Sequence, residues 1–147
     1  MKKSVLSLLA CLLALPLCAD DLAWTTSLPD AQARAKTEGK LVFVNFTGTD
    51  WCPACEQMDK DVLEKPQFVD YAKTNLVLVQ IDFPIAKKQT PELEAANAAL
   101  TNKFEVRGFP TFLVFNPSGK LVWKQEGYLD GGPKTMIAKL NKAKKKK

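Results

Sequence analysis

The chain has 147 residues, 46% of them hydrophobic, which is enough for one hydrophobic core and too few for a second domain of ordinary size. Its net charge of +5 comes from the chain ends, because two lysines follow Met1 and four more close the sequence at 144–147, leaving the body near neutrality. A basic tail can contact nucleic acid or anionic lipid, but a solvated, disordered chain end is the commoner case. We therefore expect no nucleic-acid partner and a disordered tail over 144–147.

The N-terminal segment has the pattern of a secretory signal peptide. Two lysines precede an apolar run over 5–17, and the small residue Ala19 stands before two aspartates. The run is shorter than the roughly 20 residues that a membrane-spanning helix needs. We therefore expect residues 1–19 to be removed and the domain over 20–143 to be exported to the periplasm. A lipoprotein-like sequence ending at Cys11, which would place a lipid anchor on that cysteine, is the alternative.

In the rest of the chain, short apolar runs bounded by turn-forming residues predict strands, and apolar residues at helical spacing predict helices. In chain order, we expect a strand over 22–25, a helix over 31–38, a strand over 41–46, a helix over 52–63, a short helix from Pro66, a strand over 76–83, a helix over 91–103, strands over 111–115 and 121–125, and a last helix from Gly131. Ser27 and Thr90 are expected N-caps, and Gly39 is an expected C-cap. The short turn over 116–119 predicts that the strands around it pair as an antiparallel hairpin.

The spacing of apolar residues also predicts which side chains face the core. Three positions in each of two helices should point inward: Cys55, Met58 and Val62, and Leu93, Ala96 and Leu100. Trp24 and Trp123 are also expected in the core. The almost unbroken apolar run over 41–46 is typical of a central strand covered on both faces. The order of elements therefore predicts an α/β protein in which helices cover both faces of a mixed sheet with one antiparallel edge.

Two cysteines, Cys52 and Cys55, stand where this central strand leads into a helix. If Cys11 and Cys18 leave with the signal peptide, this pair provides the only cysteines of the exported protein. A disulfide across so short a loop adds little to stability, even in an oxidising compartment. A reactive pair is therefore the better explanation.

The two cysteines are expected to differ in role. Cys52 should be the attacking thiolate, because unpaired N–H groups at a helix N-terminus stabilise negative charge. Pro53 suits the first helical position, whose N–H has no partner within the helix, and Ala54 completes the motif. Cys55, one turn deeper, should be the resolving thiol that attacks a mixed disulfide formed at Cys52.

A zinc half-site, or a pair of inert thiols, is the alternative to a redox pair. Zinc would lack two ligands, because the chain has no histidine and no second C-x-x-C pair. Glu56 stands where a haem attachment motif has its histidine. We therefore expect neither a metal nor a cofactor.

The motif and its surroundings resemble the thioredoxin superfamily. The residues that carry the resemblance are Phe43-Val44-Asn45-Phe46 leading to Trp51-Cys52-Pro53-Ala54-Cys55, and Val106-Arg107-Gly108-Phe109-Pro110-Thr111 before the predicted hairpin. The likeness extends over 22–140 and is closest to exported bacterial thioredoxin-like proteins with an F-T-G-x-D-W-C-x-x-C signature. It implies a thioredoxin fold, protein disulfides as substrates, and a membrane-bound or soluble thiol–disulfide protein as electron donor.

The resemblance also implies roles for residues around the cysteines. Pro110 corresponds to the family's cis-proline, which lies beside the cysteines and offers backbone to an extended substrate; an ordinary trans proline is the alternative. Trp51 and Phe109 would provide apolar contacts for substrates. Asn45 stands where thioredoxins usually carry a buried acid that helps to deprotonate the resolving cysteine. Because asparagine cannot accept that proton, water or another carboxylate would have to do so.

The charges near the cysteines favour a reducing couple. Pro53 and Ala54 supply no positive charge, while Asp50, Glu56 and Asp59 lie close in sequence and disfavour a thiolate. We therefore predict that the oxidoreductase reduces or isomerises protein disulfides. We also expect it to be exported and monomeric. A disulfide oxidase, or a thioredoxin-fold binding or chaperone module with a passive disulfide, is the alternative.

Overall fold

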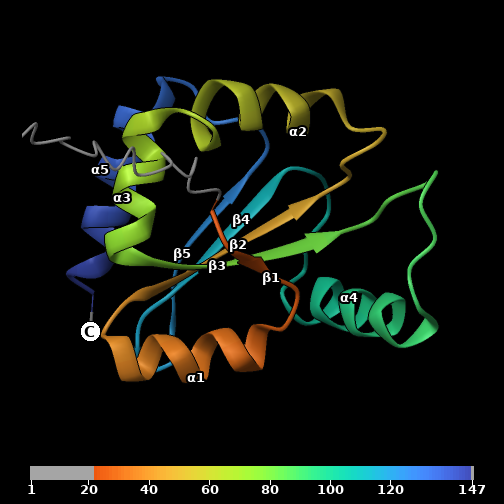
Figure 1. Ribbon diagram of the computed structural model, residues 1–147, viewed down its shortest axis with the longest axis horizontal. Helices are drawn as coiled ribbons and strands as arrows, with labels where there is room; N and C mark the ends of the chain where they lie inside the picture. Colours follow the sequence, from red (N-terminus) through yellow and green to blue (C-terminus); the bar gives the residue numbers. More distant parts are fainter. Residues whose placement is uncertain (1–21, 147) are drawn as a thin grey trace, which may run out of the picture.

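The computed structural model describes residues 22–146, which form a five-stranded sheet with helices on both faces (Figure 1). The elements in chain order are β1 (Trp24–Thr25), α1 (Leu28–Glu38), β2 (Leu41–Thr47), α2 (Pro53–Met58), a π-helical segment η1 (Asp59–Leu63), α3 (Pro66–Asn75), β3 (Leu76–Asp82), α4 (Pro91–Lys103), β4 (Thr111–Phe115), β5 (Leu121–Glu126) and α5 (Gly132–Lys144). The predicted signal peptide, with Cys11 and Cys18, lies outside the described residues.

Strand β2 lies in the middle of the sheet, whose order is β1-β3-β2-β4-β5. It pairs in parallel with β3, from Leu41 opposite Leu76 to Thr47 opposite Asp82, and antiparallel with β4. Strands β4 and β5 form the predicted antiparallel hairpin, so the sheet is mixed as expected. The carboxyl ends of β2 and β3 therefore lie side by side.

Helices α1 and α4 cover one face of the sheet, and α2, α3 and α5 cover the other (Figure 1). Alternate residues of β2 point to opposite faces, as the two-residue period of a strand requires. Phe43 packs in one cluster with Met58 and Phe68, whereas Val44 packs in the other with Ala31. Because both faces are covered, every residue of β2 is buried, which explains its nearly continuous apolar sequence.

The predicted caps of α1 and α4 are confirmed. Ser27 Oγ accepts the N–H of Asp30 at 3.3 Å. Thr90 Oγ1 accepts the N–H of Leu93 at 3.3 Å. Gly39 ends α1 in the left-handed conformation, with a φ of 67°, where a side chain would be strained. These caps fix the ends of the helices on one face of the sheet.

The predicted apolar stripe of α4 is wrong at its middle position. Leu93 and Leu100 are half-buried, but Ala96 is exposed, and Asn97 is buried with 2% of its surface accessible. The Asn97 amide donates to the Asp82 carbonyl at 3.0 Å. A side-chain hydrogen bond, rather than apolar packing, therefore anchors the middle of α4 to the end of β3.

The helix predicted over 52–63 changes its geometry half-way. Helix α2 ends at Met58, and η1 continues with wider π-helical turns, in which the Glu64 N–H donates to the Asp59 carbonyl at 2.9 Å. Cys55, Met58 and Val62 are nevertheless all buried, as the apolar spacing predicted.

Helix α5 runs through Lys144, the first lysine of the predicted basic tail. The Lys144 ammonium donates to the side chain of Asn75, and Lys146 donates to the Val122 carbonyl, both at 3.1 Å. Two lysines of that tail are therefore in contact with the folded domain. Neither α5 nor any other helix within residues 22–146 is long and apolar enough to cross a membrane.

Candidate active site

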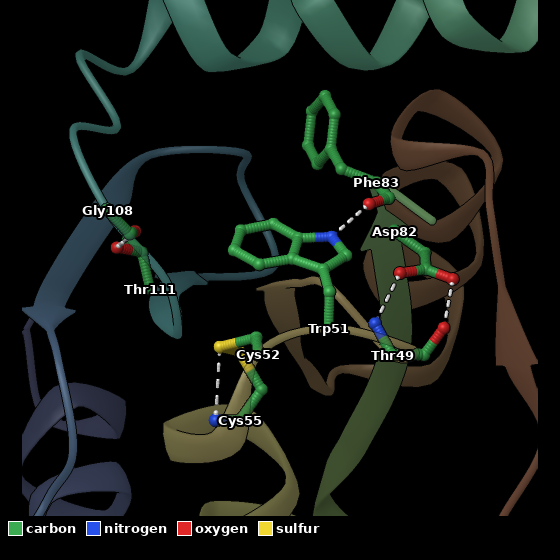
Figure 2. Close-up of a disulfide and its surroundings, with 8 residues drawn as sticks. All are labelled: Thr49, Trp51, Cys52, Cys55, Asp82, Phe83, Gly108 and Thr111. Carbon is green, nitrogen blue, oxygen red and sulfur yellow. Dashed lines mark hydrogen bonds between the residues drawn. A yellow bond between two sulfur atoms is a disulfide. The ribbon is translucent and has the colours of Figure 1, made fainter. Parts of the chain in front are cut away.

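The two cysteines lie at the N-terminus of α2 and are joined by a disulfide (Figure 2). Cys52 is the N-cap, and its Sγ accepts the N–H of Cys55 at 3.2 Å. Pro53 takes the first helical position, and both it and Ala54 are exposed. Cys52 has 8% of its surface exposed and Cys55 only 2%, so Cys52 is the more accessible of the two. A hydrogen bond donated to the Cys52 sulfur favours its thiolate once the disulfide is reduced.

A turn at Gly48 closes the loop before Cys52. The Gly48 carbonyl accepts the N–H groups of Trp51 at 3.3 Å and Cys52 at 3.0 Å. A Cβ at position 48 would collide with the indole ring of Trp51, so only glycine leaves room for that ring. The turn thereby sets the place of Trp51 beside the disulfide (Figure 2).

Hydrogen bonds join this loop to the end of β3 (Figure 2). Thr49 donates its N–H and its hydroxyl to the Asp82 carboxylate at 3.0 and 2.7 Å. The Trp51 Nε1–H donates to the Phe83 carbonyl at 2.6 Å. The end of β3, which is distant in sequence, therefore holds the cysteine-bearing loop in place.

Asp50 extends this connection to the residues after Phe83. Its carboxylate accepts the N–H of Ile85 at 2.9 Å and that of Ala86 at 2.7 Å. These hydrogen bonds, the one from Ile85 above all, lower the pKa of Asp50. The carboxylate was expected to oppose a Cys52 thiolate, but its charge is partly compensated by these amides.

The segment before β4 also meets the cysteine-bearing loop. The Phe109–Pro110 peptide bond is cis, and Pro110 is buried. Phe109 contacts Trp51 edge to face with ring centroids 5.8 Å apart, and stacks on Phe83 at 5.2 Å. Two of the three residues predicted to bind substrates, Trp51 and Phe109, are thus in contact, and Pro110 follows Phe109 directly.

Glu56, the second acid near the cysteines, forms an ion pair with Lys60 one turn later. The hydrogen bond from Lys60 lowers the pKa of Glu56. Part of its negative charge is therefore also compensated. The acids near the cysteines do not form a metal site: within residues 22–146, no group of three or more His, Cys, Asp or Glu side chains is placed to hold a metal ion.

Asn45 and the third acid, Asp59, line the same pocket of about 590 Å³. Asn45 is 3% exposed, and its Oδ1 has no hydrogen-bond partner among the described residues. Asp59 follows Cys55 by one helical turn and donates its N–H to the Cys55 carbonyl. Burial, and then the negative charges of Glu64 and Asp82, raise the pKa of Asp59 to about 6. A carboxyl with such a pKa is suited to exchange protons near neutral pH.

Comparison with known proteins agrees with this arrangement. Residues 28–144 match the family described as the thioredoxin-like domain. The chain is 31% identical to the disulfide bond reductase DsbH of Chlamydia pneumoniae over 130 residues, covering 88% of this chain and 77% of that protein. The chain belongs to the thioredoxin-like family.

Other relatives agree with the family and the fold. A thiol:disulfide interchange protein, DsbD of Klebsiella pneumoniae subsp. pneumoniae, is 34% identical over 89 residues, which cover 60% of this chain but only 13% of DsbD. A solved DsbH oxidoreductase superimposes with a TM-score of 0.78 at 28% identity, covering 98% of this chain and 96% of that one. A thioredoxin from Thermus thermophilus gives a TM-score of 0.62 at 26% identity, covering 82% and 85% of the two chains. This thioredoxin-like protein is a thiol–disulfide oxidoreductase.

In this thioredoxin-like protein, Asp59 differs most from its sequence-based interpretation. The sequence placed it only among acids that disfavour a thiolate, whereas the structure half-buries it in one pocket with Asn45. One sequence feature could have indicated that Asp59 lies near Cys55: the two residues are four positions apart, which puts both side chains on one face of a helix. Its pocket is also lined by residues of other elements, among them Asn45 of β2 and Gln80 of β3, so its burial could not be read from that spacing.

Replacing Asp59 with asparagine is expected to stabilise this thioredoxin-like protein at pH 7.5 by about 1 kcal/mol, a value reduced for partial exposure of the side chain. The pKa of the folded state, about 6, lies above the ordinary value of 3.8. Between these values the folded protein holds a proton that the unfolded chain has released, so stability falls as pH rises through this window. Denaturant unfolding of wild type and Asp59→Asn at pH 4, 5, 6 and 7.5 measures the effect.

In the wild type, Asp59 should lower the free energy of unfolding as the pH rises from 4 to 6. In Asp59→Asn this contribution should be absent. Asp70→Asn, at an exposed position of α3, serves as the control for removing one negative charge. An equal gain in stability in both variants at every pH would contradict the assignment of this effect to burial of Asp59.

Proposed function

We infer that this protein is exported and that it reduces or isomerises disulfides of other proteins through a dithiol formed by Cys52 and Cys55. The observation that carries the proposal is the placement of Cys52: its sulfur accepts an amide N–H at the head of α2, and it is more exposed than Cys55. Reduction of the substrate, rather than its oxidation, is supported by the name of one relative, a disulfide bond reductase, and by the absence of charge at Pro53 and Ala54 between the cysteines. A histidine or other cation there would favour a more oxidising couple.

In the proposed reaction, the Cys52 thiolate attacks one sulfur of the substrate disulfide. A mixed disulfide forms, and the other substrate sulfur leaves as a thiolate and takes a proton. Cys55 then loses its proton and attacks the Cys52 sulfur, which releases the second substrate thiol. Two electrons pass to the substrate, and the protein ends with the Cys52–Cys55 disulfide seen in the structure.

The proton leaving Cys55 needs an acceptor. Asn45 cannot take it, because an amide has no basic site at neutral pH. Asp59 is suited to do so, because it follows Cys55 by one turn and has a pKa near neutrality. Asp59→Asn should then slow release of substrate from the mixed disulfide without slowing the first attack, as stopped-flow mixing with a fluorescent disulfide peptide would show.

Substrate contact is assigned to Trp51, Phe109 and Pro110. Trp51 is 44% exposed although it belongs to the aromatic contacts around Phe109. A partly exposed aromatic side chain beside a reactive sulfur offers apolar contact to a peptide attached there.

We also propose that the protein works as a monomer and receives electrons from a thiol–disulfide donor, either soluble or bound to a membrane. Its likeness to a thiol:disulfide interchange protein supports such a donor.

The proposal is tested by reduction of insulin, followed as turbidity of the released chains, with a chemical dithiol as donor. The wild-type protein should accelerate precipitation strongly, and a Cys52→Ser, Cys55→Ser double variant should remain at the rate of the donor alone. No acceleration by the wild type would favour a binding or chaperone module with a passive disulfide. Titration of the Cys52 thiolate by its ultraviolet absorbance tests whether the protein reduces or oxidises its substrates, because a Cys52 pKa far below 5 would indicate an oxidase.

A further inference from the structure

The segment over 83–90, between β3 and α4, is bound firmly to the active-site loop. The Phe83 N–H donates to the Thr47 carbonyl at 2.9 Å, which continues the pairing of β3 with β2 by one residue. Beyond it, the Asp50 carboxylate accepts the N–H groups of Ile85 and Ala86. The segment therefore has a defined position beside the residues that carry the disulfide, although it contains neither helix nor strand.

This segment exposes an apolar side chain next to the site. Ile85 has 77% of its surface exposed, more than Trp51 at 44%, which is also an exposed large hydrophobic residue. The backbone of Ile85 is held by Asp50, the residue directly before Trp51. Exposed apolar side chains grouped at a reactive centre mark a surface that is covered when a partner binds. The Phe109 ring borders Trp51 on the β4 side, and the backbone of Ile85 is fixed on the β3 side by the residue before Trp51.

Positive charges follow Ile85 along the same segment. Lys87 and Lys88 are exposed, and neither forms an ion pair within residues 22–146. Two acids contact the segment: Asp50 accepts its backbone N–H groups, and Asp82, whose carboxylate also accepts hydrogen bonds, lines one pocket with both lysines. Further acids, Glu92 and Glu94, appear only after the Thr90 N-cap, in the first turn of α4. Because both aspartates already accept hydrogen bonds, Lys87 and Lys88 are the charged side chains that this segment presents to a partner.

We propose that residues 83–90 form a docking surface that selects protein substrates whose disulfide lies in an extended, acidic segment. An apolar side chain of the substrate packs against Ile85 and Trp51, and its carboxylates meet Lys87 and Lys88. A peptide joined to Cys52 that lies along Pro110 continues toward this segment. The proposal rests on the proposed function, since the partner is a disulfide substrate of the same site.

The test uses two short peptides, each with a central cysteine in disulfide with 2-mercaptoethanol. They differ only in carrying glutamates or lysines around a leucine next to the cysteine. The rate of reaction with the reduced protein is measured for each peptide and divided by the rate of the same variant with neutral bis(2-hydroxyethyl) disulfide. This division corrects for any change in Cys52 reactivity.

The wild-type protein should react about tenfold faster with the glutamate peptide than with the lysine peptide, since two exposed charge contacts are worth about that factor. The double variant Lys87→Glu, Lys88→Glu should invert the preference, and salt near 1 M should remove it. Ile85→Ser should slow both peptides about fivefold, because part of the buried apolar area is lost. The matched controls are Lys139→Glu, Lys142→Glu on α5, which covers the face of the sheet opposite to α4 (Figure 1), and Leu121→Ser on β5. Both should keep the wild-type ratio of the two peptide rates and the wild-type rates relative to the small disulfide.

A preference that survives the double charge reversal, or peptide rates insensitive to Ile85→Ser, would overturn the docking surface. The proposed function fails separately: in that case the reduced wild type would not react with bis(2-hydroxyethyl) disulfide faster than a free thiol. Reaction with the small disulfide, together with equal rates for the two peptides, would therefore reject only the docking surface.

Discussion

Replacing Cys55 with serine is expected to stop the reaction at the mixed disulfide, whereas replacing Cys52 with serine should abolish it at the first step. In the Cys55→Ser variant, Cys52 still lies at the N-cap of α2 and can attack a substrate disulfide. No second thiol is then available to release the product, so the protein remains covalently joined to its substrate. In Cys52→Ser, the remaining Cys55 is 2% exposed and out of reach of a protein disulfide.

The two variants are compared by mixing each reduced protein with a disulfide-bonded protein and separating the products without reductant. A product containing both proteins should accumulate with Cys55→Ser and be absent with Cys52→Ser. Added dithiothreitol should reduce its disulfide and separate the two proteins. Ala54→Ser, an exposed position between the cysteines, controls for adding a hydroxyl group there. Accumulation with Cys52→Ser instead would show that the roles of the two cysteines are reversed.

The second large effect is on stability, at Phe43 in the centre of β2. Its side chain is fully buried and lies 5.6 Å from the ring of Phe68 and 5.4 Å from the ring of Phe112, measured between centroids. Phe43→Ala removes these contacts and leaves a cavity that the surrounding sheet and helices cannot fill, so unfolding should become easier by about 3–5 kcal/mol. Because β2 leads directly into the Gly48 turn, this strand also supports the active-site loop.

Guanidinium unfolding followed by circular dichroism measures this loss of stability. Phe43→Leu, which keeps most of the volume, should cost less than about 1.5 kcal/mol. Leu121→Ala, at an exposed position of β5, should change stability by no more than about 0.5 kcal/mol. A cost for Phe43→Ala as small as that of the β5 variant would contradict the position of Phe43 at the centre of the core.

The fold was predictable where local patterns determine it. The continuous apolar run of β2 indicated a strand covered on both faces, and Ser27, Thr90 and Gly39 marked the ends of helices through hydrogen bonds to their own neighbours. The antiparallel hairpin followed from the short turn before Leu121. Each of these signals acts over a few residues, so the sequence contains all of its partners.

Features that depend on distant partners were not predictable in the same way. Asn97 replaces Ala96 as the buried residue of α4 because Asp82, on another element, offers a carbonyl at the right place. The sequence identified Asp50 and Asp59 as acids near the cysteines but could not indicate that one binds amides at 85 and 86 or that the other is half-buried. The candidate site was therefore predictable in its residues and only partly in its electrostatics.

The acids of the site bear directly on the direction of the reaction. Asp50 and Glu56 are partly compensated by hydrogen bonds, so they oppose a Cys52 thiolate less than their number suggests. No described residue, however, places a positive charge between the cysteines, where Pro53 and Ala54 stand. The thiolate is then stabilised mainly by the N–H groups at the start of α2, which favours a reducing couple.

The reduction potential of the Cys52–Cys55 couple tests the proposed reductase function most directly. It can be measured by equilibrating the protein with mixtures of reduced and oxidised dithiothreitol or glutathione and following tryptophan fluorescence, since Trp51 lies beside the disulfide (Figure 2). We predict a value close to that of thioredoxin, about −270 mV, and well below that of strongly oxidising dithiol proteins, about −120 mV. A potential near the latter value would contradict the proposed reductase and identify the protein as a disulfide oxidase.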